Sequence, residues 1–178
     1  GEISMYYDSM IAKLICHGST RDQAINRMRD ALNAFVIRGI DSNIPFQAAL
    51  MQNARFLSGT FTTSFIADEY PSGFVAADVV HSDPGLLAAV AAFGRRRYID
   101  RAVKVSGQMP GHERKVGSEW VVQIEGKDYP VVLTPIPGGY SVTHGADRYD
   151  LVSDWRFGEL VFHGTCNGAP LCMQLERI

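Results

Sequence analysis

Five histidines and three cysteines are the side chains best suited to metal binding, but their spacing matches none of the usual motifs. No His-x-x-x-His or Cys-x-x-Cys pair occurs in the sequence. Gly126-Lys127 is followed by Asp128, where a phosphate-binding loop needs the hydroxyl group that holds magnesium. The Gly-x-Ser-x-Gly turn that exposes a serine nucleophile is also missing. The sequence therefore predicts no catalytic residue, no metal site and no nucleotide site in this chain.

The remaining candidate for chemistry is a basic segment between residues 95 and 115, in which seven bases stand against two acids. The bases are Arg95, Arg96, Arg97, Arg101, Lys104, Arg114 and Lys115. Such a cluster can bind an acidic protein surface or a nucleic-acid backbone. It can equally be a solvated helix end, where the helix dipole favours cations. The spacing alone leaves these three alternatives open.

The elements that position these residues belong to a chain of 178 residues, a length that suits one domain or two small ones. Its 46% of hydrophobic residues and net charge of -2 are typical of a globular protein and exclude a whole-chain polyanion binder. The longest apolar run, residues 86–93, is far shorter than the roughly 20 residues that a bilayer span requires. Three cysteines argue against a disulfide framework, although Cys166 and Cys172 can meet across a hairpin. We therefore expect no membrane span and no disulfide framework.

Residues before Tyr70 show helical spacing. A helix is predicted over residues 21–38, because apolar side chains recur there three and four positions apart. Pro45 predicts the first turn of a second, shorter helix, and a third is expected over residues 62–68. The sequence Tyr70-Pro71-Ser72-Gly73 ends this pattern, so a domain boundary is predicted at about residue 70.

Residues from Ser82 onward follow another pattern. Ser82-Asp83-Pro84 predicts a helix start, and residues 86–93 have no polar face, so this helix should be buried on all sides. Short turns then separate six runs of β-forming residues, which implies antiparallel strands. The predicted strands are 120–125, 129–134, 140–144, 148–155, 159–164 and 170–176. The sequence thus predicts an α+β chain whose second part is an antiparallel β-barrel, a meander wrapped around a long central helix.

Several spaced motifs make the chain resemble a known family. The motifs are residues 6–15 (YYDSMIAKLI), 21–25 (RDQAI), 31–32 (AL), 37–40 (IRGI), 42–44 (SNI), 56–59 (FLSG), 63–66 (TSFI) and 70–74 (YPSGF). The earlier motifs resemble the end of biotin carboxylase, an ATP-grasp enzyme. The later ones narrow the likeness to the α subunits of propionyl-CoA carboxylases. Tyr7 and Asp8 match a motif near the carboxylase centre of that family, and we expect them to have a structural role here.

The resemblance implies two domains. Residues 1–70 resemble the C-terminal end of a biotin carboxylase domain, and residues 71–178 resemble a linking domain that docks on the carboxyltransferase β subunit. In the family the linking domain is an antiparallel β-barrel around one long helix. The family pattern continues past residue 178 with a further hairpin, so the barrel is expected to lack its last hairpin. The start at Gly1 similarly suggests a piece of something longer.

By the same resemblance, the parent enzyme uses biotin, ATP and magnesium to carboxylate propionyl-CoA to methylmalonyl-CoA. The family carries biotin on a lysine between two methionines, and none of the four lysines has such neighbours. The residues that bind ATP in the family would lie before Gly1. We therefore expect a non-catalytic docking fragment without a cofactor of its own. Its implied partners are the carboxyltransferase β subunit and the biotin carboxylase and biotin carrier domains of its parent chain, in the cytoplasm of a bacterium or the mitochondrial matrix of a eukaryote.

The predicted docking site is the connection over residues 105–118, since a connection this long inside a compact domain is usually functional. The resemblance implies the same, because the corresponding stretch engages the carboxyltransferase in the family. The residues expected to bind the partner are Gly107, Gln108, Met109, Pro110, Gly111, His112, Glu113, Arg114 and Lys115. The alternative is a mobile surface loop without a partner.

A function of another class is also compatible with the sequence. The chain can be a free-standing β-barrel binding module that uses its basic helix end for nucleic acid. Nucleic-acid affinity would fall steeply with salt, whereas docking would require the β subunit. We expect the docking role and no nucleic-acid partner.

Overall fold

The computed structural model of the chain describes residues 10–75, 83–112 and 114–176. Of the residues named above, Gly1, Tyr7, Asp8, Glu113 and the Ser82 of the predicted helix start lie outside this described part. The chain divides into two compact units, residues 1–79 and residues 80–178. The described part of the first unit is helical, and the second is built on a sheet.

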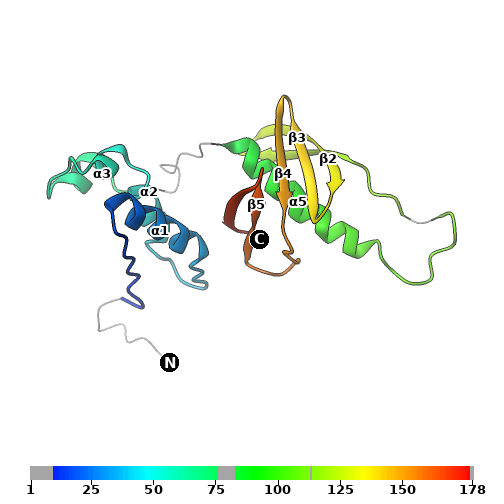
Figure 1. Cartoon of the computed structure of the whole chain (residues 1–178), viewed down its shortest axis with the longest axis horizontal. Helices are drawn as coiled ribbons and strands as arrows, with labels where there is room; N and C mark the ends of the chain where they lie inside the picture. The colour runs from blue at the N-terminus through cyan, green and yellow to red at the C-terminus, as the bar shows by residue number, and fades with distance from the viewer. Residues whose placement is uncertain (1–9, 76–82, 113, 177–178) are drawn as a thin grey trace. The chain divides into compact units, whose positions relative to one another are not determined.

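Four helices make up the regular structure of the described first unit (Figure 1). They are α1 (Arg21–Ala34), α2 (Ile44–Leu50), α3 (Ala54–Ser58) and α4 (Phe65–Glu69). Three of them agree with the predicted helices, although α1 ends at Ala34 and not at residue 38. Phe35 has an extended backbone, and the β-branched Val36 and Ile37 follow it, so the helix stops early.

Helix α3 is not among the helices predicted from the sequence. Ala54 fits the apolar stripe of the preceding helix, but the structure starts a new helix there. Asn53 caps it, because its Oδ1 accepts hydrogen bonds from the N–H groups of Arg55 (2.8 Å) and Phe56 (3.2 Å). An asparagine before a helical run is a recognised start signal, so the sequence did contain the information.

The core of the first unit is small. Its buried apolar side chains in the described part are Ile25, Leu32, Leu50 and Phe65. Ile25 and Leu32 lie on the face of α1 that the three-and-four spacing predicts. An ion pair between Arg55 and Glu69, at 2.8 Å, joins α3 to α4. The unit is therefore held by a few apolar contacts supported by polar ones.

The second unit consists of one long helix followed by six strands. The elements are α5 (Pro84–Ala102), β1 (Glu119–Ile124), β2 (Lys127–Ile136), β3 (Gly139–His144), β4 (Asp147–Val152), β5 (Val161–Cys166) and β6 (Ala169–Gln174). Each strand is antiparallel to the next, and the strand order in the sheet equals the order in the sequence. The predicted α+β class and antiparallel meander are confirmed. Within the described ranges, no helix combines the length and the hydropathy that crossing a bilayer demands.

The sheet is open. Within the described residues β1 pairs with β2 alone and β6 with β5 alone, so these strands form an open sheet, whereas the sequence predicted a barrel that lacks its last hairpin. Closure needs every strand to have two hydrogen-bonded neighbours, and the two edge strands have one each.

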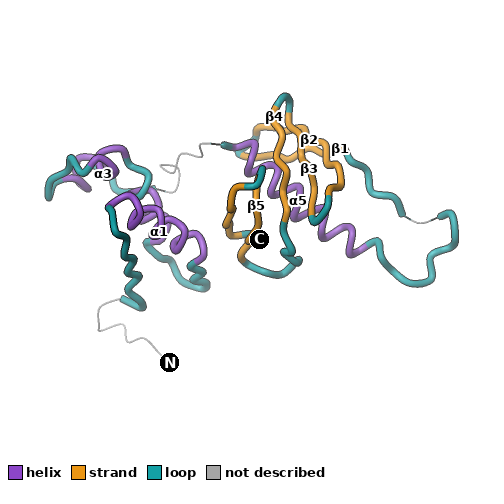
Figure 2. Tube along the Cα trace, in the orientation of Figure 1, coloured by secondary structure: helices purple, strands orange, loops and turns teal. Residues whose placement is uncertain are grey.

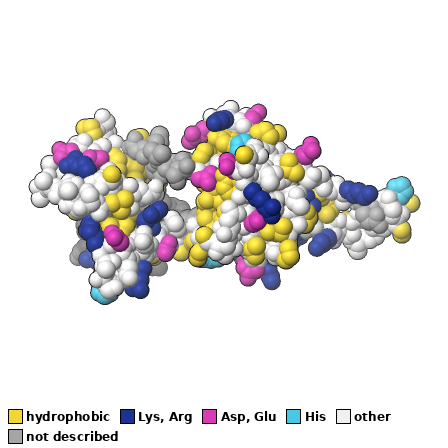
Figure 3. Space-filling model, turned by 45° about the horizontal axis from the view of Figure 1, so that its top comes forward, with side chains coloured by type: hydrophobic (Ala, Val, Ile, Leu, Met, Phe, Trp, Pro, Cys, Tyr) yellow, Lys and Arg dark blue, Asp and Glu magenta, His cyan; other side chains and the backbone are white. Residues whose placement is uncertain are grey.

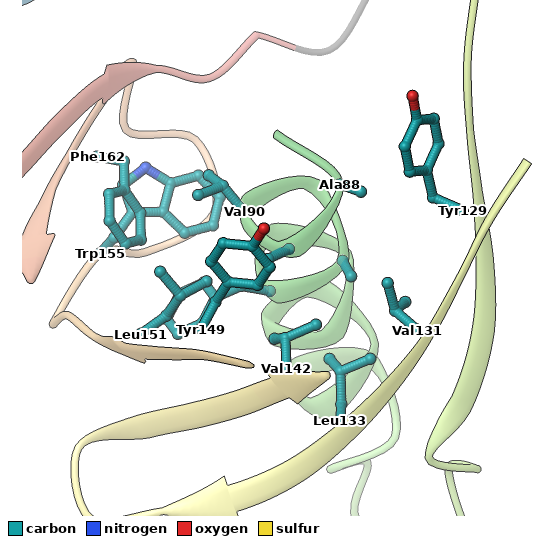
Figure 4. Packing of buried hydrophobic residues seen from close by; sticks show 13 residues of the cluster. Ala88, Val90, Tyr129, Val131, Leu133, Val142, Tyr149, Leu151, Trp155 and Phe162 are labelled. Atoms are coloured by element: carbon teal, nitrogen blue, oxygen red, sulfur yellow. The ribbon is translucent and has the colours of Figure 1, made fainter. Parts of the chain in front are cut away.

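Helix α5 packs on this sheet through its apolar half. It contacts β1, β2, β3 and β4, and the ring of Phe93, which is fully buried, meets Phe162 of β5 edge to face at 5.3 Å. Figure 4 shows Trp155 and Phe162 on one side of the helix and Val131 on another. Ala91 is exposed, however, so the prediction of a helix buried on all sides is wrong at this position.

A narrow seam joins β4 to β5. The two strands pair at only two positions, and beyond them the backbone N–H of Asn167 donates to the carbonyl of Asp150 at 3.0 Å. The side chain of Asn167 adds two further bonds to β4. Its Oδ1 accepts from the N–H of Asp150 at 2.8 Å, and its Nδ2 donates to the carbonyl of Arg148 at 3.0 Å. Asn167 and Gly168 have φ angles of 51° and 82°, as a two-residue type I′ hairpin turn requires.

The strand register separates Cys166 from Cys172. Cys166 lies opposite Ala169, and Cys172 lies opposite His163. Because side chains alternate along a strand, Cys166 shares the face of the buried Phe162, and Cys172 is on the other face. Both are free cysteines, and burial raises the pKa of the Cys166 thiol. The contact across the hairpin that the sequence left open is therefore not formed.

Candidate docking loop

The connection from α5 to β1 is a long loop that extends beyond the sheet of the second unit (Figure 2). Its residues 103–118 contain no helix or strand in the described part. Two apolar side chains are strongly exposed on it, Val105 at 62% and Met109 at 68%. These two side chains are available for contact with another protein.

The side chain of Gln108 joins the two arms of the loop, which are the residues before and after its far end at residues 109–112. Its Nε2 donates hydrogen bonds to the carbonyls of Val103 at 2.5 Å and Val105 at 3.1 Å. Its Oε1 accepts the N–H of Arg114 at 3.1 Å. One amide thus bonds backbone groups before and after the end of the loop. Gln108 is accordingly half-buried, whereas the neighbouring residues are exposed.

The far end of the loop is a tight turn over residues 109–112. The N–H of His112 donates to the carbonyl of Met109 at 3.0 Å. Pro110 is the second residue of this turn, and Gly111 is the third, with a φ of 82°. Proline and then a positive-φ glycine are the residues that a type II turn prefers. The turn therefore has a defined shape that exposes the Met109 side chain.

The base of the loop is fixed to the sheet and the helix. The carbonyl of Gly117 accepts hydrogen bonds from Arg96 Nη1 at 3.1 Å and from Trp120 Nε1 at 2.9 Å. The next carbonyl, of Ser118, accepts the N–H of Leu133 at 2.8 Å. These bonds use backbone oxygens of the loop, so its anchoring does not depend on the identity of its side chains.

The predicted site residues are brought together in this one loop, apart from Glu113, which is outside the described residues. Figure 3 shows Lys and Arg side chains and a histidine gathered on the part of the second unit that projects beyond the sheet. His112, Arg114 and Lys115 are exposed, as expected for groups that steer a partner. Val105 lies in the predicted docking connection over residues 105–118 but is missing from the nine residues expected to bind the partner. The sequence shows a single valine between Lys104 and Ser106, and its exposure of 62% appears only in the structure.

The three consecutive arginines of α5 do not form one basic surface. Arg96 pairs with Asp100 at 2.8 Å, and Asp100 also accepts a hydrogen bond from the Tyr140 hydroxyl. Burial, with this hydrogen bond, raises the pKa of Tyr140. Arg97 Nη2 donates to the carbonyl of Ser153 at 2.7 Å. Two of the seven bases of the basic segment, Arg96 and Arg97, are thus used inside the unit. The other five are exposed, and they are Arg95, Arg101, Lys104, Arg114 and Lys115.

Arg95 lies at the surface. Its guanidinium stands over the ring of Tyr98 at 5.0 Å, and Tyr98 packs on Phe157 with ring centroids 4.7 Å apart. This contact is a cation–π pair on a small aromatic cluster. Arg95 is the one arginine of the three whose charge remains available at the surface of the described part.

The described residues do not gather a group of three or more side chains able to hold a metal ion. The first unit has a groove of about 980 Å³ between residues 10–14, α1 and the segment that leads into α2. Its lining is mainly apolar, with Lys13 and Asp41 as the charged residues. The groove has no cluster of acids, bases or nucleophiles that would indicate catalysis.

Two family models match the chain. Residues 1–68 match the family described as "Biotin carboxylase C-terminal domain". Residues 87–178 match the family described as "Propionyl-coenzyme A carboxylase BT domain". The second match includes the whole candidate loop.

Two relatives that align with nearly the whole chain are named propionyl-CoA carboxylase alpha chains. The chain is 43% identical over 179 residues to a propionyl-CoA carboxylase alpha chain of Ruegeria pomeroyi, an alignment that covers all of this chain and 26% of the relative. It is 30% identical over 176 residues to the mitochondrial propionyl-CoA carboxylase alpha chain of Mus musculus, covering 97% of this chain and 24% of the relative. A biotin carboxylase 1 of Bacillus subtilis is 55% identical over 64 residues, covering 36% of this chain and 14% of the relative. The chain thus spans about a quarter of the length of the alpha chains that it matches.

Proposed function

The chain belongs to the family of propionyl-CoA carboxylase alpha chains, and on this premise we propose that its second unit docks the parent chain on a carboxyltransferase β subunit. The observation that carries the proposal is the exposed loop at the end of α5, which is bonded internally and fixed at its base. We assign residues 1–70 to the end of the biotin carboxylase domain and residues 71–178 to the linking domain. The matches over residues 1–68 and 87–178 support this division.

The parent enzyme is proposed to carboxylate propionyl-CoA with ATP, bicarbonate, biotin and magnesium. The names of the relatives support this reaction. The residues in hand do not fit these groups, because the described part gathers no metal-binding cluster and none of the four lysines lies between two methionines. We therefore propose that the rest of the biotin carboxylase domain and the biotin carrier domain hold the cofactors, and that carboxyl transfer takes place on the carboxyltransferase β subunit. This chain would hold the biotin carboxylase and biotin carrier domains near the carboxyltransferase.

The loop has the composition of a docking element. Met109 offers an adaptable apolar contact at the turn. Arg114 and Lys115 add positive charge around it, which would raise the association rate with an acidic partner surface, and the exposed His112 adds a polar ring. The residues proposed to bind the partner are Gly107, Gln108, Met109, Pro110, Gly111, His112, Glu113, Arg114 and Lys115.

We propose that the sheet and α5 hold the start of this loop in a fixed position. Contacts of α5 with four strands and of Phe93 with Phe162 support an arrangement in which the sheet curls around the helix as an incomplete barrel. Such packing keeps the last turn of α5 in a fixed position relative to the sheet, so the first residue of the loop is also fixed.

The decisive experiment replaces residues 105–116 with a Gly-Ser linker of equal length in the complete alpha chain. Gly117 and Ser118 stay, so the bonds at the base of the loop are retained. We expect an unchanged melting transition and loss of co-purification with the β subunit. Native affinity in the linker variant would show that the docking surface lies elsewhere. A parallel salt series with a DNA duplex tests the other function class, and we expect no binding.

A further inference from the structure

We propose that Gln108 is a positioning residue that holds the loop in its partner-binding shape before the partner arrives. This inference rests on the proposed docking function and adds a specific device to it. The loop would then bind as a preformed element, and not by folding on the partner surface. Gln108 belongs to the segment proposed to bind the partner, but the role proposed here acts through the backbone that its side chain orders and requires no contact between that side chain and the partner.

The geometry supports this role. Gln108 uses both ends of its amide: two hydrogen bonds go back to Val103 and Val105, and one comes from Arg114. The bonds connect backbone positions that are separated by up to eleven residues of chain, from 103 to 114. In the described part of the loop, Gln108 is the side chain that bonds to the backbone of both arms.

The loop needs such a restraint. Gly107 and Gly111 both adopt positive φ, and glycine has more backbone freedom to lose than any other residue. Ordering a residue costs conformational entropy, so in an unrestrained loop this cost would arise at the moment of binding. A restraint already present in the free protein removes that cost and strengthens binding.

The turn at residues 109–112 depends on the same restraint. Gln108 directly precedes Met109, and its side chain is fixed at three points. The direction in which the turn and the exposed Met109 side chain point is therefore set by Gln108. Without the three bonds the turn can keep its own hydrogen bond and still point in many directions.

The test compares Gln108→Ala and Gln108→Glu in the complete alpha chain, with binding to the purified β subunit measured by surface plasmon resonance. Glutamate keeps an oxygen that can accept from Arg114 but loses both donors, and its charge faces two carbonyls. Gln123→Ala is the matched control, because Gln123 is an exposed glutamine on β1 with a single side-chain bond, to Asp128. We expect both Gln108 variants to bind at least about tenfold more weakly, with the control unchanged.

The kinetics separate positioning from direct contact. If Gln108 sets the fraction of loops that are ready to bind, its loss lowers the association rate in proportion. A lost direct contact would instead raise the dissociation rate. Faster hydrogen exchange at the Arg114 amide, together with an unchanged melting temperature, is expected in Gln108→Ala alone.

The outcomes distinguish this inference from the docking function. If the linker variant fails to bind while Gln108→Ala binds with native rates, the loop docks but Gln108 does not position it. If the linker variant itself binds normally, both the docking loop and the role of Gln108 are wrong. Slow association in the two Gln108 variants, with loss of binding in the linker variant, supports both.

Discussion

The hydroxyl of Tyr149 donates a hydrogen bond to Oδ1 of Asp83 at 2.9 Å, across 66 residues of sequence. The same oxygen accepts the N–H of Leu86, also at 2.9 Å, and so caps the start of α5. One carboxylate thus joins the first turn of the helix to β4. Tyr149 is almost fully buried, and burial together with this hydrogen bond raises its pKa to about 12.

The first prediction concerns the space above Gly85. A Cβ at this position would lie 2.4 Å from the Tyr149 hydroxyl oxygen, so Gly85→Ala should destabilise the second unit by about 1 to 3 kcal/mol. Tyr149→Phe alone should cost about 1 kcal/mol through the lost hydrogen bond. The double variant should be more stable than the sum of the two losses implies, because the clashing oxygen is gone. Urea denaturation of the four proteins measures this coupling, and simple additivity would contradict it.

The second prediction is a dependence of stability on alkaline pH. The pKa of Tyr149 is about 12 in the folded protein and about 10 in the unfolded chain, so the folded state binds the phenolic proton more tightly. The resulting stabilisation is complete below pH 10 and is lost as the pH rises from 10 to 12. Wild-type protein should therefore lose more unfolding free energy over this interval than Tyr149→Phe does. Parallel curves for the two proteins would show that Tyr149 does not contribute.

The third prediction tests the packing of α5. Phe93 has no exposed surface and touches the rings of Phe162 and Tyr140, so Phe93→Ala should destabilise by about 3 to 5 kcal/mol. Phe157→Ala is the matched control, because Phe157 is 37% exposed. Its loss should be well below that of Phe93. Thermal melts followed by near-ultraviolet circular dichroism report both, and a neutral Phe93→Ala would place the helix outside the core.

The fourth prediction separates two roles of Asn167. Asn167→Gly keeps a residue that accepts the φ of 51° but removes both side-chain bonds to β4, which should cost about 1 to 3 kcal/mol. Asn167→Ala loses the bonds and also strains the backbone, so it should cost about 1 kcal/mol more. The Asp150 amide should exchange faster with solvent in both variants. Equal stability of the glycine variant and wild type would mean that the seam holds without the asparagine.

The sheet could be predicted from the sequence because its determinants are local. Six strands follow one another, and each pairs with its neighbour in sequence; their connections are two-residue turns except for residues 153–160 between β4 and β5. On β1 the half-buried Trp120, Val122 and Ile124 alternate with exposed residues, as period-two patterning indicates. Period-two patterning and turn residues suffice for such a meander.

Long-range polar contacts could not be predicted in the same way. Arg97 looks like one of three surface cations in the sequence, yet it bonds to the carbonyl of Ser153, 56 residues away. Gln108 carries no motif, and its role follows from the positions of three backbone groups around it. A hydrogen bond of this kind depends on backbone placed by the whole fold, and no periodicity encodes it. The location of the loop was therefore predictable, whereas the group that shapes it was not.

The placement of α5 before all the strands has a consequence for synthesis. Phe93 is covered by Phe162, which emerges from the ribosome about 70 residues later. At about 5 to 20 residues per second, this interval lasts roughly 4 to 14 seconds. During that time an apolar helix is complete while the strand that covers it has not been made. Nascent chains of this protein should therefore be clients of ribosome-associated chaperones until β5 has been translated.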